Sequence, residues 1–506
     1  MTARAGLEGR PTGNRALMLE EPLIFEQDAP GRSGVDFAPL TLDEDRLGGL
    51  ARRAPVGLPG LSEPEVVRHF TRLSQKNYGI DSGLFPLGSC TMKHNPRLNE
   101  KLARLEGLAD LHPLQPASTV QGVLELFDQL SHWLSTLTGM PALALSPGAG
   151  AHGELCGMMT IRTALEDRGD ARKRVLVPES AHGTNPATAA ALGYEVDALP
   201  ANARGRVDSA ELKARLDSDV AALMITNPST CGLFEDEIIE IAEAVHAVGG
   251  YVYLDGANFN ALVGRVRPGD LGVDAMHINL HKTFSTPHGG GGPGSGPVAL
   301  TAELSPFAPF PQLVHDETGF RLVEHGPEAA KSFGRLKGFH GQTGMFIRAL
   351  AYMLSHGGDG LRQVSEDAVL AANYVLARTK DSLSPAFEGG CMHECLFDDT
   401  FLEGTGVTTH DFSKALIDEG YHPMTVYFPL VVHGALLVEP TESESKASLD
   451  LFIETLRTLA AKAKAGEEAL FHEAPRHAPR RRLDETRAAR HPRLRWRANA
   501  QAAAAE

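Results

Sequence analysis

The feature that most constrains the fold of this sequence is a regular alternation of short apolar runs and helical patterns between residues 141 and 301. The runs are too short for helices and are typical of buried strands. They are ALAL (142–145), RVLVP (174–178), EVDAL (195–199), AALMIT (221–226), YVYLD (251–255), AMHINL (275–280) and PVALT (297–301). Such alternation predicts an α/β fold with a mostly parallel, doubly wound sheet. Ligands of these sheets bind beyond the carboxyl ends of the strands.

The chain has 506 residues, which are too many for a single hydrophobic core. Its residue pattern changes along the sequence and divides it into segments. Residues 1–140 are rich in turns and short helical pieces, and we expect this N-terminal segment to contribute to the active site and to a partner interface. Residues 141–383 should form the large domain that binds the ligand. Residues 384–470 return to short strands and helices, which predicts a smaller α+β C-terminal domain, and residues 471–506 form a basic tail that we expect to be flexible.

Charge is distributed unevenly over the chain. The net charge is −16, although residues 474–506 carry nine arginines against three acids. The acidic body disfavours a nucleic-acid partner. No apolar run approaches the roughly 20 residues of a membrane span, and the first residues contain acids and lack a continuous apolar signal. We therefore expect a cytoplasmic protein without a membrane or nucleic-acid partner.

The five cysteines are scattered and odd in number, which does not suggest a disulfide framework. The segment Cys391-Met-His393-Glu-Cys395 superficially resembles a metal site. However, it has no second ligand pair at zinc-like spacing. We expect no metal.

The segment HINLHKTFSTPHGGGGPGSGP (277–297) places Lys282 directly after an apolar run. An ammonium loses hydration in apolar surroundings, so this lysine needs a partner or a lowered pKa. A lysine that can shed its proton can form a Schiff base. Taken alone, a lysine that leaves a strand end for solvent is the simpler interpretation. The glycine run lacks the Lys-Ser/Thr ending of a nucleotide P-loop.

The segment YVYLDGANFN (251–260) changes that balance, because Asp255 ends an apolar run 27 residues before Lys282. A carboxylate can pair with the pyridinium nitrogen of pyridoxal phosphate (PLP) and keep its ring an electron sink. Ala257 could then lie against the ring. An aspartate at a strand end is also a common helix cap. The two residues together, rather than either one, favour a PLP site.

Three further motifs follow predicted strands. SPGAGAHGE (146–154) joins a strand to a helix, where exposed backbone N–H groups can receive a phosphate. SAHGTNPA (180–187) offers a histidine that could stack on a cofactor ring, and ITNPST (225–230) offers hydrogen bonds to its phenolic oxygen. The residues that these motifs and the His-Lys pair add to the candidate site are Gly150, Ala151, His152, His182, Thr226, Asn227 and His281.

The order of these motifs resembles fold-type I PLP enzymes, and longer strings resemble one family, the P-protein of the glycine cleavage system. The strings are EPLIFEQDAPGR, VVRHFTRLSQKNYGIDSGLFPLGSCTMKHNP, SAHGTNPATAA, YLDGANFNALVGRVRPGDLG, NLHKTFSTPHGGGGPGSGP and YHPMTVYFPL. The resemblance covers residues 21–465, and EPLIFE resembles the second subunit of two-subunit bacterial forms. His94, the run 341–344 and the basic tail depart from the family pattern.

The resemblance implies PLP as cofactor and Lys282, Asp255 and His182 as catalytic residues. It implies an oxidoreductase that decarboxylates glycine, releases CO₂ and transfers the aminomethyl group to the lipoyl disulfide of H-protein. The implied partners are glycine, lipoylated H-protein and a first P-protein subunit, in a heterotetramer with two copies of each chain. The Asp, His and Lys set alone would also permit a cysteine desulfurase or an amino-acid decarboxylase. A scaffolding subunit with a vestigial site is the alternative from another class.

Overall fold

The structure, a computed structural model, describes residues 21–28, 31–35, 37–38, 48–54, 56–288, 294–326, 330–338, 340–478 and 480–496. The chain forms two compact units, Gly83–His472 and the pair of terminal segments Met1–Ser82 and Glu473–Glu506. The division at residues 140, 383 and 470 that the sequence suggests stays a prediction. Within the described residues, no helix combines the length and the apolar character that crossing a membrane requires.

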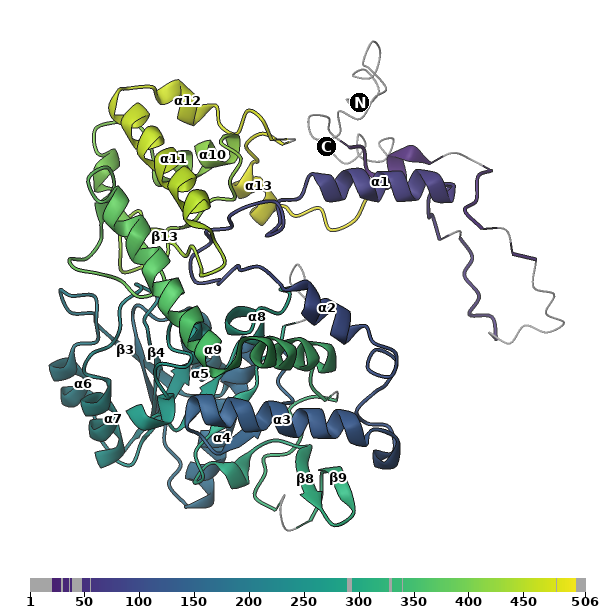
Figure 1. The fold of residues 1–506 in the computed structure, drawn as a ribbon, viewed down its shortest axis with the longest axis vertical. Helices are drawn as coiled ribbons and strands as arrows, with labels where there is room; N and C mark the ends of the chain where they lie inside the picture. The colour runs from purple at the N-terminus through teal and green to yellow at the C-terminus, as the bar shows by residue number, and fades with distance from the viewer. Residues whose placement is uncertain are drawn as a thin grey trace. The chain divides into compact units, whose positions relative to one another are not determined.

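The Gly83–His472 unit is built on a seven-stranded sheet of order β1-β7-β6-β5-β4-β2-β3. Figure 1 shows β3 and β4 of this sheet with helices around them. Strands β2 to β6 pair in parallel, whereas β7 runs antiparallel to both of its neighbours. The strands are β1 (Ala142–Ala144), β2 (Arg174–Pro178), β3 (Glu195–Leu199), β4 (Val220–Thr226), β5 (Tyr251–Asp255), β6 (Ala275–His277) and β7 (Val298–Leu300). The predicted mostly parallel sheet is confirmed.

Helices cover both faces of this sheet, because alternate side chains along each buried strand point to opposite faces. In β4, Leu223 and Ile225 join a core with α3 (Gln121–Thr138), α6 (Ser209–Arg215), α7 (Ile238–Ala247) and the start of α9 (Thr343–Thr379). Ala222 and Met224 join the opposite core with α4 (Gly150–Asp167) and α5 (Thr184–Ala191). The doubly wound arrangement is therefore confirmed.

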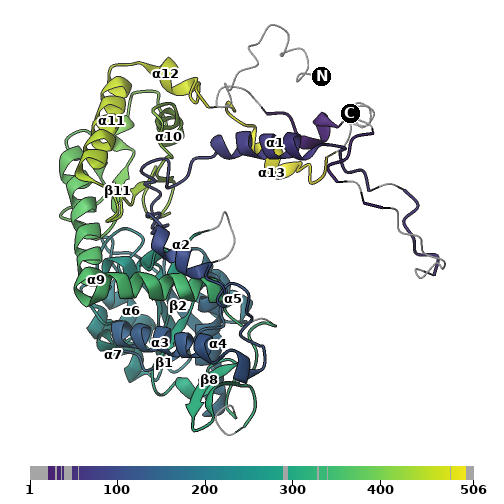
Figure 2. The ribbon, with the colours of Figure 1, turned by 45° about the vertical axis from the view of Figure 1, so that its right-hand side comes forward.

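A second, antiparallel sheet of order β10-β11-β13-β12 lies in the C-terminal part of the same unit. Its elements are β10 (Ser384–Pro385), β11 (Cys395–Asp398), β12 (Thr425–Val426) and β13 (Leu436–Val438), with helices α10 (Thr409–Asp418), α11 (Lys446–Lys464) and α12 (Glu468–His472). These elements give the smaller α+β region that the sequence predicts. Helix α9 leads into it and is kinked at Gly357, where φ is +64°. Figure 2 shows α9 and α11 side by side.

Two smaller features complete the Gly83–His472 unit. Helix α2 (Arg97–Ala103) packs on α9, and β8 (Gln312–Asp316) with β9 (Gly319–Val323) forms a hairpin. The run AMHINL differs from a single strand: β6 ends at His277, and α8 (Leu280–Thr283) begins after the extended Asn279. Lys282 therefore lies on a short helix rather than at a strand end.

The terminal unit contains η1 (Ile24–Gln27), α1 (Glu63–Gln75) and α13 (Glu485–Arg490). Glu21 accepts hydrogen bonds from both Arg72 Nε (2.8 Å) and Arg72 Nη2 (2.6 Å), and it also contacts His69 on α1. The rings of Phe25 and Trp496 stack with centroids 5.0 Å apart. The Phe25–Trp496 contact joins the N-terminal and C-terminal segments of this unit.

Candidate active site

The carboxyl ends of the parallel strands bring several of the predicted residues to one edge of the large sheet. Asp255 ends β5, Thr226 ends β4, and His182 follows β2. Partial burial lowers the pKa of His182, while the charge of Asp255 raises it and that of Lys282 lowers it further. The Asp, His and Lys side chains therefore lie within electrostatic range of one another, although they are 73 and 27 residues apart in the sequence.

Lys282 is half-buried on α8 and directs its ammonium at a backbone oxygen. Its Nζ donates a hydrogen bond to the carbonyl oxygen of Ser89, 2.9 Å away. Ser89 belongs to the PLGSCTMKHNP segment (86–96), which reaches the active-site edge from far away in the sequence. That segment therefore forms part of the wall beside the lysine.

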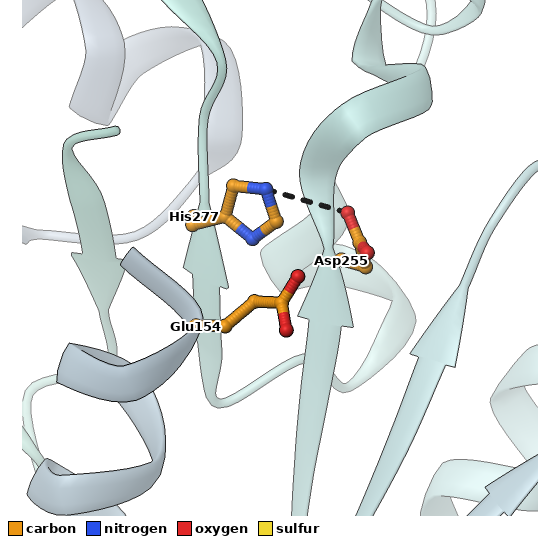
Figure 3. A group of neighbouring side chains, drawn as sticks. All are labelled: Glu154, Asp255 and His277. Carbon is orange, nitrogen blue, oxygen red and sulfur yellow. Dashed lines mark ion pairs between the residues drawn. The ribbon is translucent and has the colours of Figure 1, made fainter. Parts of the chain in front are cut away.

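Asp255 is 3% exposed and is held from three sides. Its Oδ1 accepts a hydrogen bond from Ala257 N (2.9 Å) and lies 3.3 Å from His277 Nε2 (Figure 3). Its Oδ2 lies 3.1 Å from the Asn185 amide nitrogen when that amide faces the carboxylates. Tyr253 OH and His277 Nδ1, 2.6 Å apart, continue the network behind the imidazole. These contacts fix the orientation of the carboxylate.

Glu154, the last residue of the motif SPGAGAHGE, is a further residue of the site. It lies on α4 and points toward Asp255 and His277 in Figure 3, and donor atoms of the three residues lie within 4.8 Å of one another. Burial raises the pKa of Glu154 to about 9, and the charge of Asp255 adds to the rise. Glu154 therefore carries a proton at neutral pH. The available signal was its position, since it shares the apolar stripe of α4 with Met158 and Ile161.

The N-terminus of α4 (Gly150) is where the small residues predict an anion site. Gly150, Ala151 and His152 form its first turn, where backbone N–H groups lack helical partners. Gly150 has no room for a side chain, because a Cβ there would lie 2.4 Å from Asn279 Oδ1. The basic side chain of Lys337 also lies near this turn. Its Nζ is 2.8 Å from where a Cβ would stand if Gly148 carried one. No sequence pattern pointed to Lys337.

The remaining predicted residues differ in how free their polar atoms are. Thr226 Oγ1 is buried without a hydrogen-bond partner among the described residues. Asn227, by contrast, exchanges hydrogen bonds with the backbone of Glu235, which occupies its amide. Burial lowers the pKa of His281 to about 3, so its imidazole is neutral. Thr226 is therefore better placed than Asn227 to meet a ligand.

The chain is similar to proteins of one named group. A family model described as glycine dehydrogenase, C-terminal domain, matches residues 364–479, and one described as aminotransferase class-V matches residues 153–291. A probable glycine dehydrogenase (decarboxylating) subunit 2 from Caulobacter vibrioides is 67% identical, over 96% of this chain and 94% of the relative. The corresponding protein from Listeria innocua is 48% identical, over 94% and 99% of the two chains.

Solved structures with the same fold include a glycine decarboxylase (P-protein) of the glycine cleavage system in inhibitor-bound form. It has a TM-score of 0.69 and 22% identity, over 82% of this chain and 93% of the other. A sphingosine-1-phosphate lyase from Burkholderia pseudomallei has a TM-score of 0.59 and 14% identity, over 83% and 94%. At these identities the two structures support the fold.

Proposed function

The chain belongs to the family of glycine dehydrogenase (decarboxylating) subunit 2, and we propose that it binds PLP and decarboxylates glycine with transfer of the aminomethyl group to the lipoyl disulfide of H-protein. The observation that carries this proposal is the convergence of Lys282, Asp255 and His182 at the carboxyl edge of the large sheet. The proposal adds to the family assignment a cofactor (PLP), a substrate (glycine) and an acceptor (the lipoyl disulfide).

The described residues fit PLP chemically. Lys282 would hold the aldehyde carbon, Asp255 would face the ring nitrogen, and His182 and Ala257 would lie against the ring. The first turn of α4 would receive the phosphate, and the unpartnered Thr226 hydroxyl is available for the phenolic oxygen. Bound there, PLP would supply an electron sink for the bonding pair that CO₂ leaves behind.

The protein's own groups would prepare this chemistry by orientation. Three neighbours hold the Asp255 carboxylate, so the charge opposite the ring nitrogen needs no rearrangement. In the reaction, the bond between the carboxyl and methylene carbons of glycine breaks and CO₂ leaves. The methylene carbon bonds to one lipoyl sulfur, and the other sulfur takes a proton as a thiol. The glycine carbon is oxidised and the disulfide is reduced.

The proposal includes partners. We infer a heterotetramer with two copies of this chain and two of a first subunit, which lipoylated H-protein contacts transiently, in the cytoplasm. H-protein must leave after each turnover, so its contact should be smaller and more polar than the permanent one.

Glycine-dependent exchange of labelled bicarbonate, with PLP, the first subunit and lipoylated H-protein present, tests the function. Lys282→Ala should abolish both the exchange and the PLP that borohydride fixes to the chain. Lys331→Ala, at an exposed lysine paired with Asp167 (2.8 Å), is the matched control and should retain both. Borohydride fixation of PLP to another lysine in the wild-type protein would refute the assignment.

A further inference from the structure

The segment Gly88–Thr91, here called the Ser89 loop, has a backbone that needs external support. Ser89 and Thr91 have φ values of 63° and 48°, in the left-handed region that residues with a Cβ rarely adopt. Gly88 passes so close to β13 that a Cβ would lie 2.3 Å from Leu437 Cγ. Such a conformation persists only where surrounding contacts hold it.

Two fully buried glutamates from the smaller sheet provide that support. Ser89 N donates to Glu394 Oε2 (2.8 Å), while Cys90 N (3.1 Å) and Thr91 N (2.9 Å) both donate to Glu439 Oε2. Thr91 Oγ1 adds a bond of 2.5 Å to Glu439 Oε1. Three successive N–H groups therefore point to the carboxyl groups of Glu394, which directly precedes β11, and Glu439, which directly follows β13.

The same arrangement turns a carbonyl toward the lysine. Because the N–H groups of the Ser89 loop face the smaller sheet, the Ser89 oxygen is free to accept the hydrogen bond from Lys282 Nζ. Lys93 secures the other side of the loop, since its buried Nζ donates to Thr283 O (2.8 Å), next to Lys282 in α8. The Ser89 loop is thus held by the two glutamates on one side and, through Lys93, by α8 on the other.

We propose that the Ser89 carbonyl is the docking site of the Lys282 amine whenever that amine is not bonded to the cofactor, and that Glu439 and Glu394 are positioning residues that aim this carbonyl. The inference rests on the proposed function of Lys282. An amine displaced by substrate has a defined hydrogen-bond acceptor at this site. It is thereby held close by, ready to return when the product leaves.

The two glutamates could also act on Lys282 through their charge rather than by aiming the Ser89 carbonyl, because many titratable groups surround the lysine. Those whose pKa responds to its charge are Cys90, Glu154, His182, His277, His281, His288, His393 and Glu394. Burial raises the pKa of Glu394 well above its usual range, and the charge of Glu439 adds to this. Glu394 and Glu439 both present carboxyl groups to the loop, so geometry and charge must be separated at each of them.

Two substitutions make that separation. Glu439→Gln removes the charge but keeps an oxygen for both N–H groups and an amide that can donate to Thr91 Oγ1. Glu439→Asp keeps the charge but withdraws the carboxylate from the loop by one methylene. Glu394→Gln and Glu394→Asp repeat the comparison at Ser89 N, should either Glu439 variant fail to fold.

The measurement is the rate at which PLP attaches to the apo-protein as a function of pH, followed by absorbance and by borohydride trapping at Lys282. Attachment requires a neutral, undocked amine. In Glu439→Asp the protonated Lys282 amine should lose its hydrogen bond to Ser89 O. The midpoint of the pH profile should then fall by about one pH unit, so that attachment at pH 7 becomes about tenfold faster. The Glu439→Gln profile should stay close to that of the wild type.

Two results would overturn the docking site. If Glu439→Gln shifts the midpoint and Glu439→Asp does not, charge rather than geometry controls the amine. If neither substitution shifts it, the loop does not hold the lysine. A wild-type protein that attaches no PLP at Lys282 would instead refute the proposed function, so the two failures are distinguishable.

Discussion

The carboxyl groups of Glu154 and Asp255 approach within 4.8 Å of each other while each residue is only 3% exposed. Two buried carboxyl groups at this distance do not both ionise easily. The oxygens of Glu154 lie 3.1 and 3.2 Å from the Asn185 amide nitrogen, which also reaches Asp255. The pair can therefore hold a proton on Glu154, next to Asp255, the residue that would face the cofactor ring.

This pair predicts a pH dependence of stability. The pKa of Glu154 is raised by burial and by Asp255 to about 9 in the folded protein, above its ordinary value. The folded state therefore binds a proton that the unfolded state releases, so stability falls as pH rises from about 5 to about 9. Glu154→Gln removes this titration and keeps the shape. Its urea midpoint should fall less between pH 6 and pH 8.5 than that of the wild type.

The control for Glu154→Gln is Glu211→Gln, at an exposed glutamate in the first turn of α6. Its urea midpoint should follow the wild-type pH profile. Parallel profiles for Glu154→Gln and the wild type would mean that Glu154 does not hold the extra proton.

Asp255→Ala should lower glycine-bicarbonate exchange by about 10³ or more, as loss of other charge-stabilising groups does. Covalent attachment of PLP at Lys282 should survive, because the hydrogen bond of the lysine goes to Ser89 O rather than to Asp255. Exchange rates and borohydride trapping measure the two effects separately. Asp270→Ala, at an exposed acid paired with Arg267, is the control. Near-normal exchange in Asp255→Ala would remove Asp255 from the proposed mechanism.

The sequence predicted the sheet well because each strand carries its own signal. Strands β2, β3 and β5 span the same residues as the runs RVLVP, EVDAL and YVYLD. The motifs around Lys282 and Asp255 were also local, since each follows one apolar run. The α8 helix was missed because its four residues are too few to show a helical period.

Long-range contacts account for what the sequence did not give. Ser89 and Lys282 are 193 residues apart, and Cys90 and Glu439 are 349 apart. No periodic pattern indicates which loop will approach which strand end. Glu154 differs, because its spacing from Met158 and Ile161 was a sequence signal. An acid near a glycine-rich turn ordinarily faces solvent, however, and the packing of α4 against β6 accounts for the burial of this one.

Lys93 should be important for stability. Its buried Nζ donates to Glu442 Oε1 (2.6 Å) and Asn260 Oδ1 (2.8 Å). Lys93→Met would leave the Glu442 carboxylate largely buried without its cation, at a cost of about 3–5 kcal/mol in the free energy of unfolding. Lys446→Met, at an exposed pair with Asp450, should change the free energy of unfolding far less, because solvent screens an exposed ion pair. Urea denaturation of both variants tests this, and equal costs would contradict it.

The last prediction concerns the first subunit. Several large apolar side chains of the terminal unit are exposed in the isolated chain, namely Phe37 (86%), Leu50 (88%), Leu58 (75%), Phe70 (54%) and Leu494 (90%). Singly exposed apolar residues are common, but this number on short segments is typical of a surface that a partner covers. A permanent interface often buries more than about 2,000 Å². We therefore expect the chain to self-associate without its partner and to be catalytically incomplete alone.

Purification of the chain without the first subunit makes this testable. Sedimentation should show self-association that the first subunit suppresses, and glycine-bicarbonate exchange should rise on its addition. The matched control is Lys282→Ala with the first subunit, which should give no exchange and so assign the activity to this chain. Because the lysine, the acid and the α4 N-terminus all lie within Gly83–His472, the partner would act by completing the surroundings of the site. Full exchange by the isolated chain, unchanged on addition, would show that no partner is needed.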